Sequence, residues 1–155
     1  LICVGKLKEK FYLAACAEYQ KRLGAYCKLE LTELSEERLP QNPSRAQIDA
    51  ALEREAAAIR GKIPQNACLV ALCVEGRPHS SEELARLVRS WQDSAARHLV
   101  FVIGGSFGLA ESLKKEAKVR LSMSPMTFPH HLARVMVLEQ IYRAFKINEG
   151  SSYHK

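Results

Sequence analysis

The chain has 155 residues, 47% of them hydrophobic, and a formal net charge of +6. A chain of this length buries roughly 68–70% of its unfolded surface on folding. It can therefore form a hydrophobic core without disulfide bonds or structural metal ions, and disorder is not expected. The longest apolar run, residues 67–74, is far shorter than the roughly 18 residues of a membrane span. We therefore expect one domain over residues 1–155 and no contact with a membrane.

Five cysteines are an odd number, and none of them forms a Cys-x-x-Cys pair. Most of them lie within apolar periodic segments, as buried free thiols do. The spacing fits neither a disulfide framework nor a zinc site, so we expect no metal. Free thiols indicate the reducing cytoplasm.

The positive charge is concentrated near the C-terminus. Residues 114–155 contain 8 of the 23 lysines and arginines but only 3 of the 17 acidic residues. Aromatic residues lie among these cations, a composition that suits a phosphate-rich partner such as RNA. A solvated basic helix face explains the charge equally well.

The first half of the chain alternates strands and helices. Residues 1–4 form an apolar strand, and residues 8–23 carry apolar side chains at helical steps before Gly24. Residues 28–34 alternate as an edge strand does, and residues 35–43 form a loop.

Two Ser-x-x-Glu/Gln capping boxes predict helix starts. Ser44 and Gln47 precede a helix that ends at Gly61, and Ser80 and Glu83 precede a second one. Between these helices, residues 67–74 are apolar on both faces, as in a strand at the centre of a sheet.

The second half continues the alternation. Buried strands are expected at residues 98–103 and 119–124, and helices at residues 110–118 and 131–147. The whole pattern predicts an α/β fold with a mostly parallel sheet flanked by helices on both faces.

In open parallel sheets, ligands bind beyond the carboxyl ends of the strands. Three segments follow predicted buried strands: 75–78, 104–109 and 124–130. The glycines of the second segment let a ligand approach the backbone closely. They do not form the G-x-G-x-x-G of a dinucleotide site, and a tight strand-to-helix turn explains them equally well.

Individual side chains leave more than one interpretation open. His130 is a candidate general base or a structural donor near a helix start. Glu139 and Arg143 are spaced for an i,i+4 ion pair, which we favour over catalysis. Arg134 and Arg143 lie on opposite sides of one helix, so at least one should face a loop or a partner chain. The sequence identifies no Cys-His, Ser-His-Asp or paired-carboxylate set.

Several motifs together resemble a known family, the RlmH-type 23S rRNA pseudouridine N3-methyltransferases of the SPOUT superfamily. They are VGKLKEK (4–10), AEYQKRLG (17–24), FVIGGSFGL (101–109), MTFPHHLARVMVLEQIYRAFKI (126–147) and YHK (153–155). Within them, IGG-x-x-G, T-x-P-H, EQ-x-YRA and YHK occur in this order. The resemblance extends over essentially the whole chain.

The resemblance implies properties that the hydrophobic periodicity of the sequence does not indicate. It implies a C-terminal deep trefoil knot around S-adenosylmethionine, although chains as a rule do not knot. It also implies a homodimer that methylates ring nitrogen 3 of a pseudouridine in 23S rRNA of the large subunit, in assembled ribosomes.

Carried over by position, the resemblance implies cofactor contacts from the three loops. Pro125 lacks an amide hydrogen, which puts a backbone donor there in doubt. The implied cofactor residues are Leu72, Gly104, Gly105, Met123, Ser124, Pro125, Met126, Thr127 and Phe128.

For catalysis, the candidate bases are His130, His154 or a water molecule. For RNA, we expect Arg134, Arg143 and Lys155 to meet phosphates, and Tyr142 or Tyr153 to stack on a base.

Two other classes of function remain possible. A non-catalytic ribosome- or RNA-binding factor would keep the basic region but would not bind S-adenosylmethionine. An enzyme with another nucleotide cofactor would hold that ligand on residues 104–108.

Overall fold

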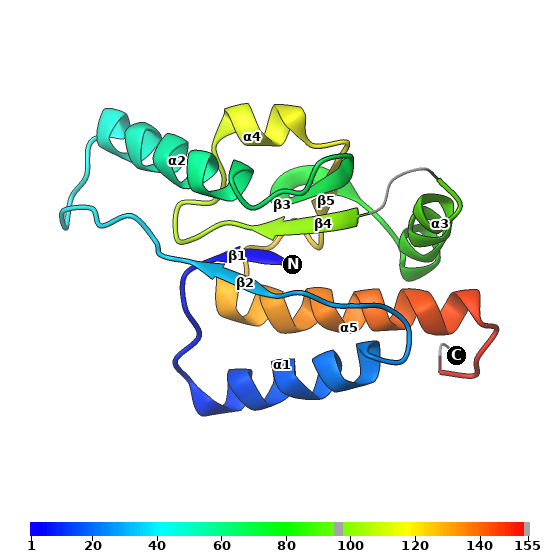
Figure 1. The fold of residues 1–155 in the computed structure, drawn as a ribbon. Coiled ribbons are helices and arrows are strands. Elements are labelled where there is room, and N and C mark those ends of the chain that lie inside the picture. The colour runs from blue at the N-terminus through cyan, green and yellow to red at the C-terminus, as the bar shows by residue number, and fades with distance from the viewer. Residues whose placement is uncertain (95–97, 154–155) are drawn as a thin grey trace.

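The computed structural model describes residues 1–94 and 98–153 (Figure 1). Strands and helices alternate along the chain in the order that the sequence predicts. They are β1 (Ile2–Val4), α1 (Lys10–Leu23), β2 (Thr32–Leu34), α2 (Arg45–Arg60), β3 (Ala67–Pro78), α3 (Ser81–Gln92), β4 (His98–Ile103), α4 (Glu111–Glu116), β5 (Val119–Ser122) and α5 (His130–Asn148).

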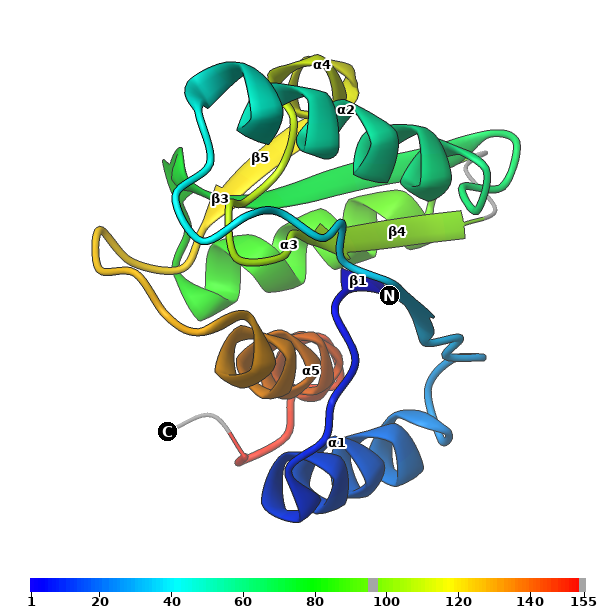
Figure 2. The ribbon, with the colours of Figure 1, turned by 90° about the vertical axis from the view of Figure 1, so that its left-hand side faces the viewer.

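The five strands form one sheet in the order β2-β1-β4-β3-β5. Every pairing in it is parallel. The carboxyl ends therefore meet at one edge, which faces the viewer in Figure 2. This arrangement confirms the predicted α/β class.

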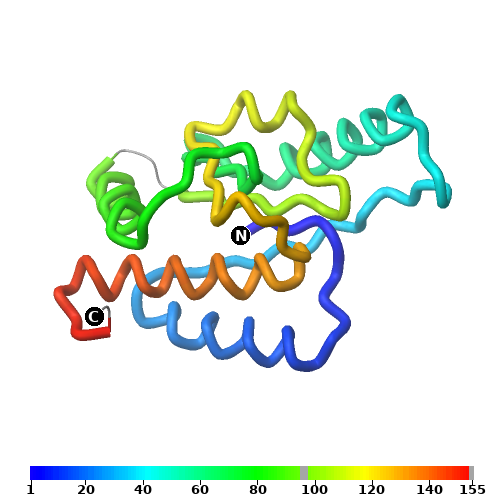
Figure 3. The backbone as a smooth tube through the Cα atoms, turned by 180° about the vertical axis from the view of Figure 1, so that it is seen from behind, coloured from blue at the N-terminus to red at the C-terminus, as the bar shows by residue number. Residues whose placement is uncertain are grey.

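Helices cover both faces of the sheet. The helices α2 and α4 lie on one face, and α3 and α5 lie on the other, with α1 packed against α5 (Figures 1 and 3). Side chains alternate between the two layers, because successive residues of a strand point to opposite faces. In β4, for example, Phe101 and Ile103 pack toward α3 and α5, whereas Val100 and Val102 pack toward α2 and α4.

The strands β2 and β3 differ most from the prediction in length. β2 has only residues 32–34, because only these pair with β1. β3 continues to Pro78 instead of ending at residue 74, because it pairs with β5 on both sides of a bulge. Leu121 of β5 lies opposite both Leu72 and Arg77, so residues 73–76 protrude from the ladder.

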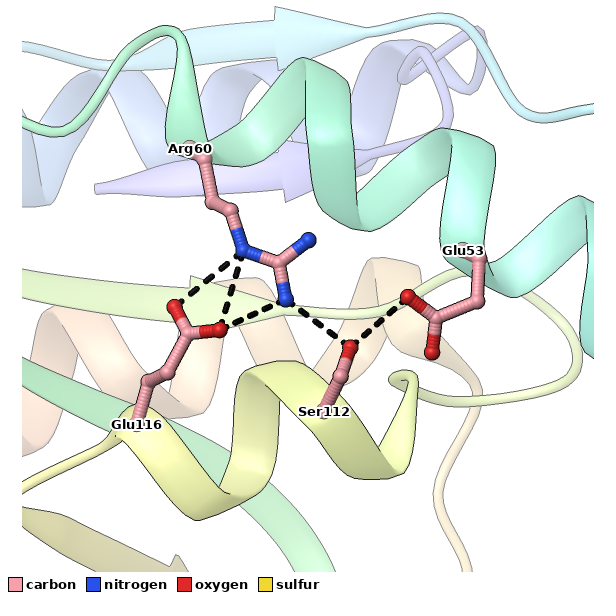
Figure 4. Close-up of polar contacts among 4 residues, drawn as sticks. All are labelled: Glu53, Arg60, Ser112 and Glu116. Atoms are coloured by element: carbon pink, nitrogen blue, oxygen red, sulfur yellow. Dashed lines mark hydrogen bonds and ion pairs between the residues drawn. The ribbon is translucent and has the colours of Figure 1, made fainter.

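The helix starts follow the predicted caps. Ser44 and Gln47 form a complete capping box before α2, and Ser80 and Glu83 form one before α3. The short α4 is tied to α2 by side chains (Figure 4). Arg60 donates to Glu116 and to Ser112, and Ser112 donates in turn to Glu53.

Arg134 corrects one prediction. Its side chain is fully buried, although we expected it to meet phosphates. The guanidinium forms an ion pair with Glu33 of β2 and donates to the carbonyl oxygen of Gly5 at 2.9 Å. A buried arginine needs such partners, because an isolated charge in the interior is costly. Arg134 therefore holds α5 against the sheet and is not available to RNA.

Glu33 is held as a charged partner. Burial would raise the pKa of this carboxyl, but a hydrogen bond from the Leu7 amide and the ion pair with Arg134 outweigh it and lower the pKa.

No helix within residues 1–94 and 98–153 is long and apolar enough to cross a membrane. The knot that the resemblance implies stays a prediction.

The ion pair between the buried Arg134 and the partly exposed Glu33 makes the mutation Glu33→Ala a test of how α5 is held against the sheet. Breaking such a pair leaves an uncompensated charge, which we expect to lower the free energy of unfolding by about 3 kcal/mol. Urea denaturation followed by circular dichroism measures this change. The control is Glu30→Ala, which removes an exposed partner of Lys28 and should change stability little. Equal effects of both variants would contradict the assigned role of Arg134.

Candidate functional site

A cleft of about 790 Å³ opens at the carboxyl edge of the sheet. Three segments form it: the bulge of β3, the turn after β4, and the connection from β5 into α5. Ligand sites of comparable proteins have this size and this position. The cleft lies where the sequence places the ligand, and its apolar walls include Leu72, Ile103, Leu121, Met123 and Phe128.

The turn after β4 is built from glycines because no side chain fits there. A Cβ at Gly104 would lie 2.2 Å from the carbonyl oxygen of Gly108. The amide of Gly108 donates to the carbonyl of Gly105 at 3.1 Å, and Gly108 itself has a φ of +83°. The glycines of the turn therefore leave backbone accessible in the cleft, beside Ser106, Phe107 and Leu109, which line it too.

Glu36 supports this turn from the loop after β2. Its carboxylate accepts a hydrogen bond from the amide of Ser106 at 2.5 Å. Burial would raise the pKa of Glu36, but the hydrogen bonds from Ser106 and the nearby His130 and His131 outweigh burial and lower it. The sequence analysis missed Glu36, because the contact joins residues 70 positions apart.

The connection between β5 and α5 is held by short-range hydrogen bonds. The hydroxyl of Ser122 donates to the carbonyl of Ser124, and the hydroxyl of Ser124 accepts from the amide of Met126. The structure brings together all the predicted cofactor residues except Pro125, which does not line the cleft: Leu72, Gly104, Gly105, Met123, Ser124, Met126, Thr127 and Phe128.

His130 begins α5 and lines the same cleft. Its Nε2 lies 2.9 Å from the point where a Cβ on Gly5 would be. The centroids of the His130 and His131 rings are 3.9 Å apart. Burial is the main cause that lowers the pKa of His130, and the neighbouring His131 lowers it further. The ring is therefore neutral at physiological pH and able to accept a proton.

Three of the predicted RNA-contacting residues, Tyr142, Arg143 and Tyr153, lie close together beside the C-terminal half of α5. The rings of Tyr142 and Tyr153 are 5.1 Å apart, and the guanidinium of Arg143 lies 4.9 Å from the ring centre of Tyr153. Arg143 also donates to Glu139, which confirms the predicted i,i+4 ion pair. His154 and Lys155 lie outside the described residues.

The sequence analysis singled out neither of the two charged residues that pair in the cleft, Glu75 and Lys114. Glu75 comes from the bulge of β3, and Lys114 reaches the cleft from α4 and pairs with it. A pattern search cannot find this pair, because its members lie 39 residues apart on different elements.

A smaller hollow of about 500 Å³ adjoins the cleft, with which it shares Leu121 and Met123. It lies between α3 and α5, and Ser81 donates to Gln140 within it. It contains no residue of the glycine turn, so the larger cleft is the candidate ligand site.

Cysteine chemistry is not a feature of the site. Cys73 lines the cleft, but burial is the main cause that raises the pKa of its thiol. All five cysteines are unpaired, and no metal-binding group of His, Cys, Asp or Glu occurs among the described residues. The arrangement thus favours binding by backbone and apolar surface.

Comparison with known proteins extends this description. A family model described as "Predicted SPOUT methyltransferase" matches residues 1–154. Relatives named "Ribosomal RNA large subunit methyltransferase H" from Clostridioides difficile (strain 630), Clostridium novyi (strain NT) and Streptococcus mutans serotype c are 44%, 46% and 46% identical. Each alignment covers 100% of this chain and 98% of the relative.

A solved structure, "a probable methylase family protein from Haemophilus influenzae Rd KW20", has a similar fold. Its TM-score is 0.53 at 14% sequence identity, and the match covers 99% of this chain and 69% of that chain.

The parallel sheet and the cleft at its carboxyl edge define an α/β protein of the class that binds a small ligand beyond its strands. Within that class, the match over residues 1–154 shows that the chain belongs to the SPOUT methyltransferase family.

The glycine turn generates a paired prediction. In Gly104→Ala the new Cβ meets the backbone of Gly108, which cannot move without opening the turn, so we expect lower stability and loss of ligand binding. In Gly105→Ala the new Cβ meets the Glu36 carboxylate at 2.6 Å, which a flexible side chain can relieve. Thermal unfolding and calorimetry with S-adenosylmethionine measure both variants. Equal losses of thermal stability and of ligand affinity in the two variants would contradict the argument that the backbone of Gly108 leaves no room for a Cβ at residue 104.

Proposed function

We propose that this protein transfers the methyl group of S-adenosylmethionine to ring nitrogen 3 of a pseudouridine in 23S rRNA, and that it acts on assembled ribosomes. The observation that carries the proposal is the cleft: the Gly104–Gly108 turn and residues 123–128 line one cavity of about 790 Å³. The family membership and the names of the full-length relatives support the reaction class and the rRNA substrate.

The cleft suits the proposed cofactor. S-adenosylmethionine is a drug-sized molecule with a flat aromatic adenine, and cavities of roughly 300 to 1,000 Å³ hold such ligands. Leu72, Ile103 and Phe128 offer apolar walls, and the turn at Gly104 and Gly105 offers backbone within close approach.

When bound, the sulfonium supplies a methyl group that needs no further activation. The chain then has two tasks: to hold the reacting atoms in line and to remove the proton from ring nitrogen 3. The neutral His130 is the candidate base that the described residues offer at the cleft. His154 and a water molecule remain the alternatives.

RNA binding is assigned to Tyr142, Arg143 and Tyr153 beside the C-terminal half of α5. Tyr142 and Tyr153 offer aromatic surfaces for stacking, and Arg143 adds a cation beside them. Lys155 adds a further charge in the sequence. The net charge of +6 is modest for selecting one site, so we propose that the shape of the assembled ribosome supplies the remaining selectivity.

A homodimer, the trefoil knot and a cytoplasmic location belong to the same proposal. Phe11 and Leu13 on α1 are 64% and 47% exposed, and a second copy would cover such apolar side chains. A cytoplasmic location accords with five unpaired cysteines and with a ribosomal substrate.

The direct test is labelled methyl transfer from S-adenosylmethionine to ribosomes that lack this modification, followed by nucleoside mapping. We expect label on ring nitrogen 3 of one pseudouridine and a much lower rate on deproteinised rRNA. Equal rates on both substrates would contradict action on assembled ribosomes. Binding to ribosomes without cofactor binding or label would favour the alternative, a non-catalytic ribosome-binding factor.

The proposed base gives a pH-dependent prediction. His130→Asn should lower kcat by about 100-fold or more at neutral pH and change the KM for the cofactor much less. Because the pKa of His130 is lowered, the wild-type rate should stay constant down to below about pH 6.5 and then fall as the ring gains a proton. The variant should lack this fall. A variant with the wild-type rate and profile would assign the base to His154 or water.

A further inference from the structure

The bulge of β3 places one carboxylate in the cleft. β3 pairs with β5 before and after residues 73–76, so the bulge is fixed at both ends. At Gly76 the two backbones approach so closely that a Cβ would lie 2.7 Å from the carbonyl oxygen of Arg120. This close contact sets the position of the preceding residue, Glu75, on the cleft wall.

Lys114 holds Glu75 in place. Its side chain is only 10% exposed and forms ion pairs with Glu75 and with Glu111 on its own helix. The side chain of Glu75 is 52% exposed, so its carboxylate is far more accessible to a ligand in the cleft than the ammonium of Lys114.

The charge of Glu75 is secured at neutral pH. The hydrogen bond from Lys114 is the main cause that lowers the pKa of this carboxyl, against the opposing effect of burial. The positive charge of Arg120 on β5 also lowers the pKa of Glu75.

Among the described residues that line the cleft, Glu75 is the only carboxylate. The other walls are apolar side chains, glycine backbone and a few hydroxyl, thiol and imidazole groups. S-adenosylmethionine carries ribose hydroxyls, an ammonium and a positive sulfonium, all of which an anionic acceptor favours.

We propose that Glu75 is a specificity-determining residue that recognises the hydrogen-bond donors or the positive charge of the cofactor, and that Lys114 is the residue that positions it. This inference rests on the proposed function, because it takes S-adenosylmethionine as the ligand of the cleft.

The experiment is calorimetric measurement of the binding of three ligands to the chain of residues 1–155. S-adenosylmethionine carries all three groups, S-adenosylhomocysteine lacks the sulfonium charge, and 5′-methylthioadenosine lacks the amino-acid part but keeps the ribose. For Glu75→Gln we expect the Kd of S-adenosylmethionine to rise about 10- to 100-fold, as for a lost hydrogen bond to a charged group. Lys114→Met should weaken the same ligand by a smaller factor, because the carboxylate loses its position.

The three ligands distinguish the group that Glu75 recognises. If Glu75→Gln loses affinity for all three ligands, Glu75 recognises the ribose hydroxyls. If it loses affinity only for S-adenosylmethionine and S-adenosylhomocysteine, Glu75 recognises the ammonium. Loss for S-adenosylmethionine alone supports the sulfonium. Unchanged affinity for all three in Glu75→Gln overturns the inference. Failure of the wild-type chain to bind S-adenosylmethionine overturns the proposed function, and this inference with it.

Two further variants separate recognition from folding. Glu116→Gln breaks the ion pair with Arg60 on the same helix as Lys114 but away from the cleft, and it should leave all three affinities unchanged (Figure 4). Glu75→Asp keeps the charge on a shorter side chain and should bind with intermediate affinity. A loss in Glu116→Gln as large as in Glu75→Gln would assign the effect to α4 stability and overturn the inference.

Discussion

The buried guanidinium of Arg134 is the interaction on which the site depends. It joins the first turns of α5 to Glu33 of β2 and to the carbonyl of Gly5 just after β1. Gly5 in turn has no side chain at the point where the His130 ring packs. Because a buried charge must keep its partners, this contact fixes where α5 begins. The position of His130 at the cleft follows from it.

Local features of the fold could be predicted from the sequence, and long-range ones could not. Both capping boxes and the strand of residues 98–103 depend on neighbours within a few positions, so their residues define them. Arg134 looked like a surface cation because the C-terminal region is basic. Its partner Glu33 lies 101 positions away, and no local pattern joins the two.

The candidate site shows the same division. The glycines at 104, 105 and 108 could be found from the sequence as a glycine-rich turn after a strand. The backbone of Gly108 leaves no room for a Cβ at Gly104, and Gly108 has a positive φ. The side chains that hold the cleft walls, Glu36 and Lys114, come from elements that only the tertiary structure brings near. Sequence reasoning therefore located the cleft but not the charges that shape it.

The cleft is assembled from segments that are far apart along the chain, namely residues 72–75, 103–109 and 121–133. During translation, the last of these segments leaves the ribosome well after the first. A nascent chain therefore has no complete cleft until β5 and the start of α5 have been synthesised and have docked. Occupation of this cleft by a ligand therefore requires that β3, β4, β5 and the start of α5 have already come together.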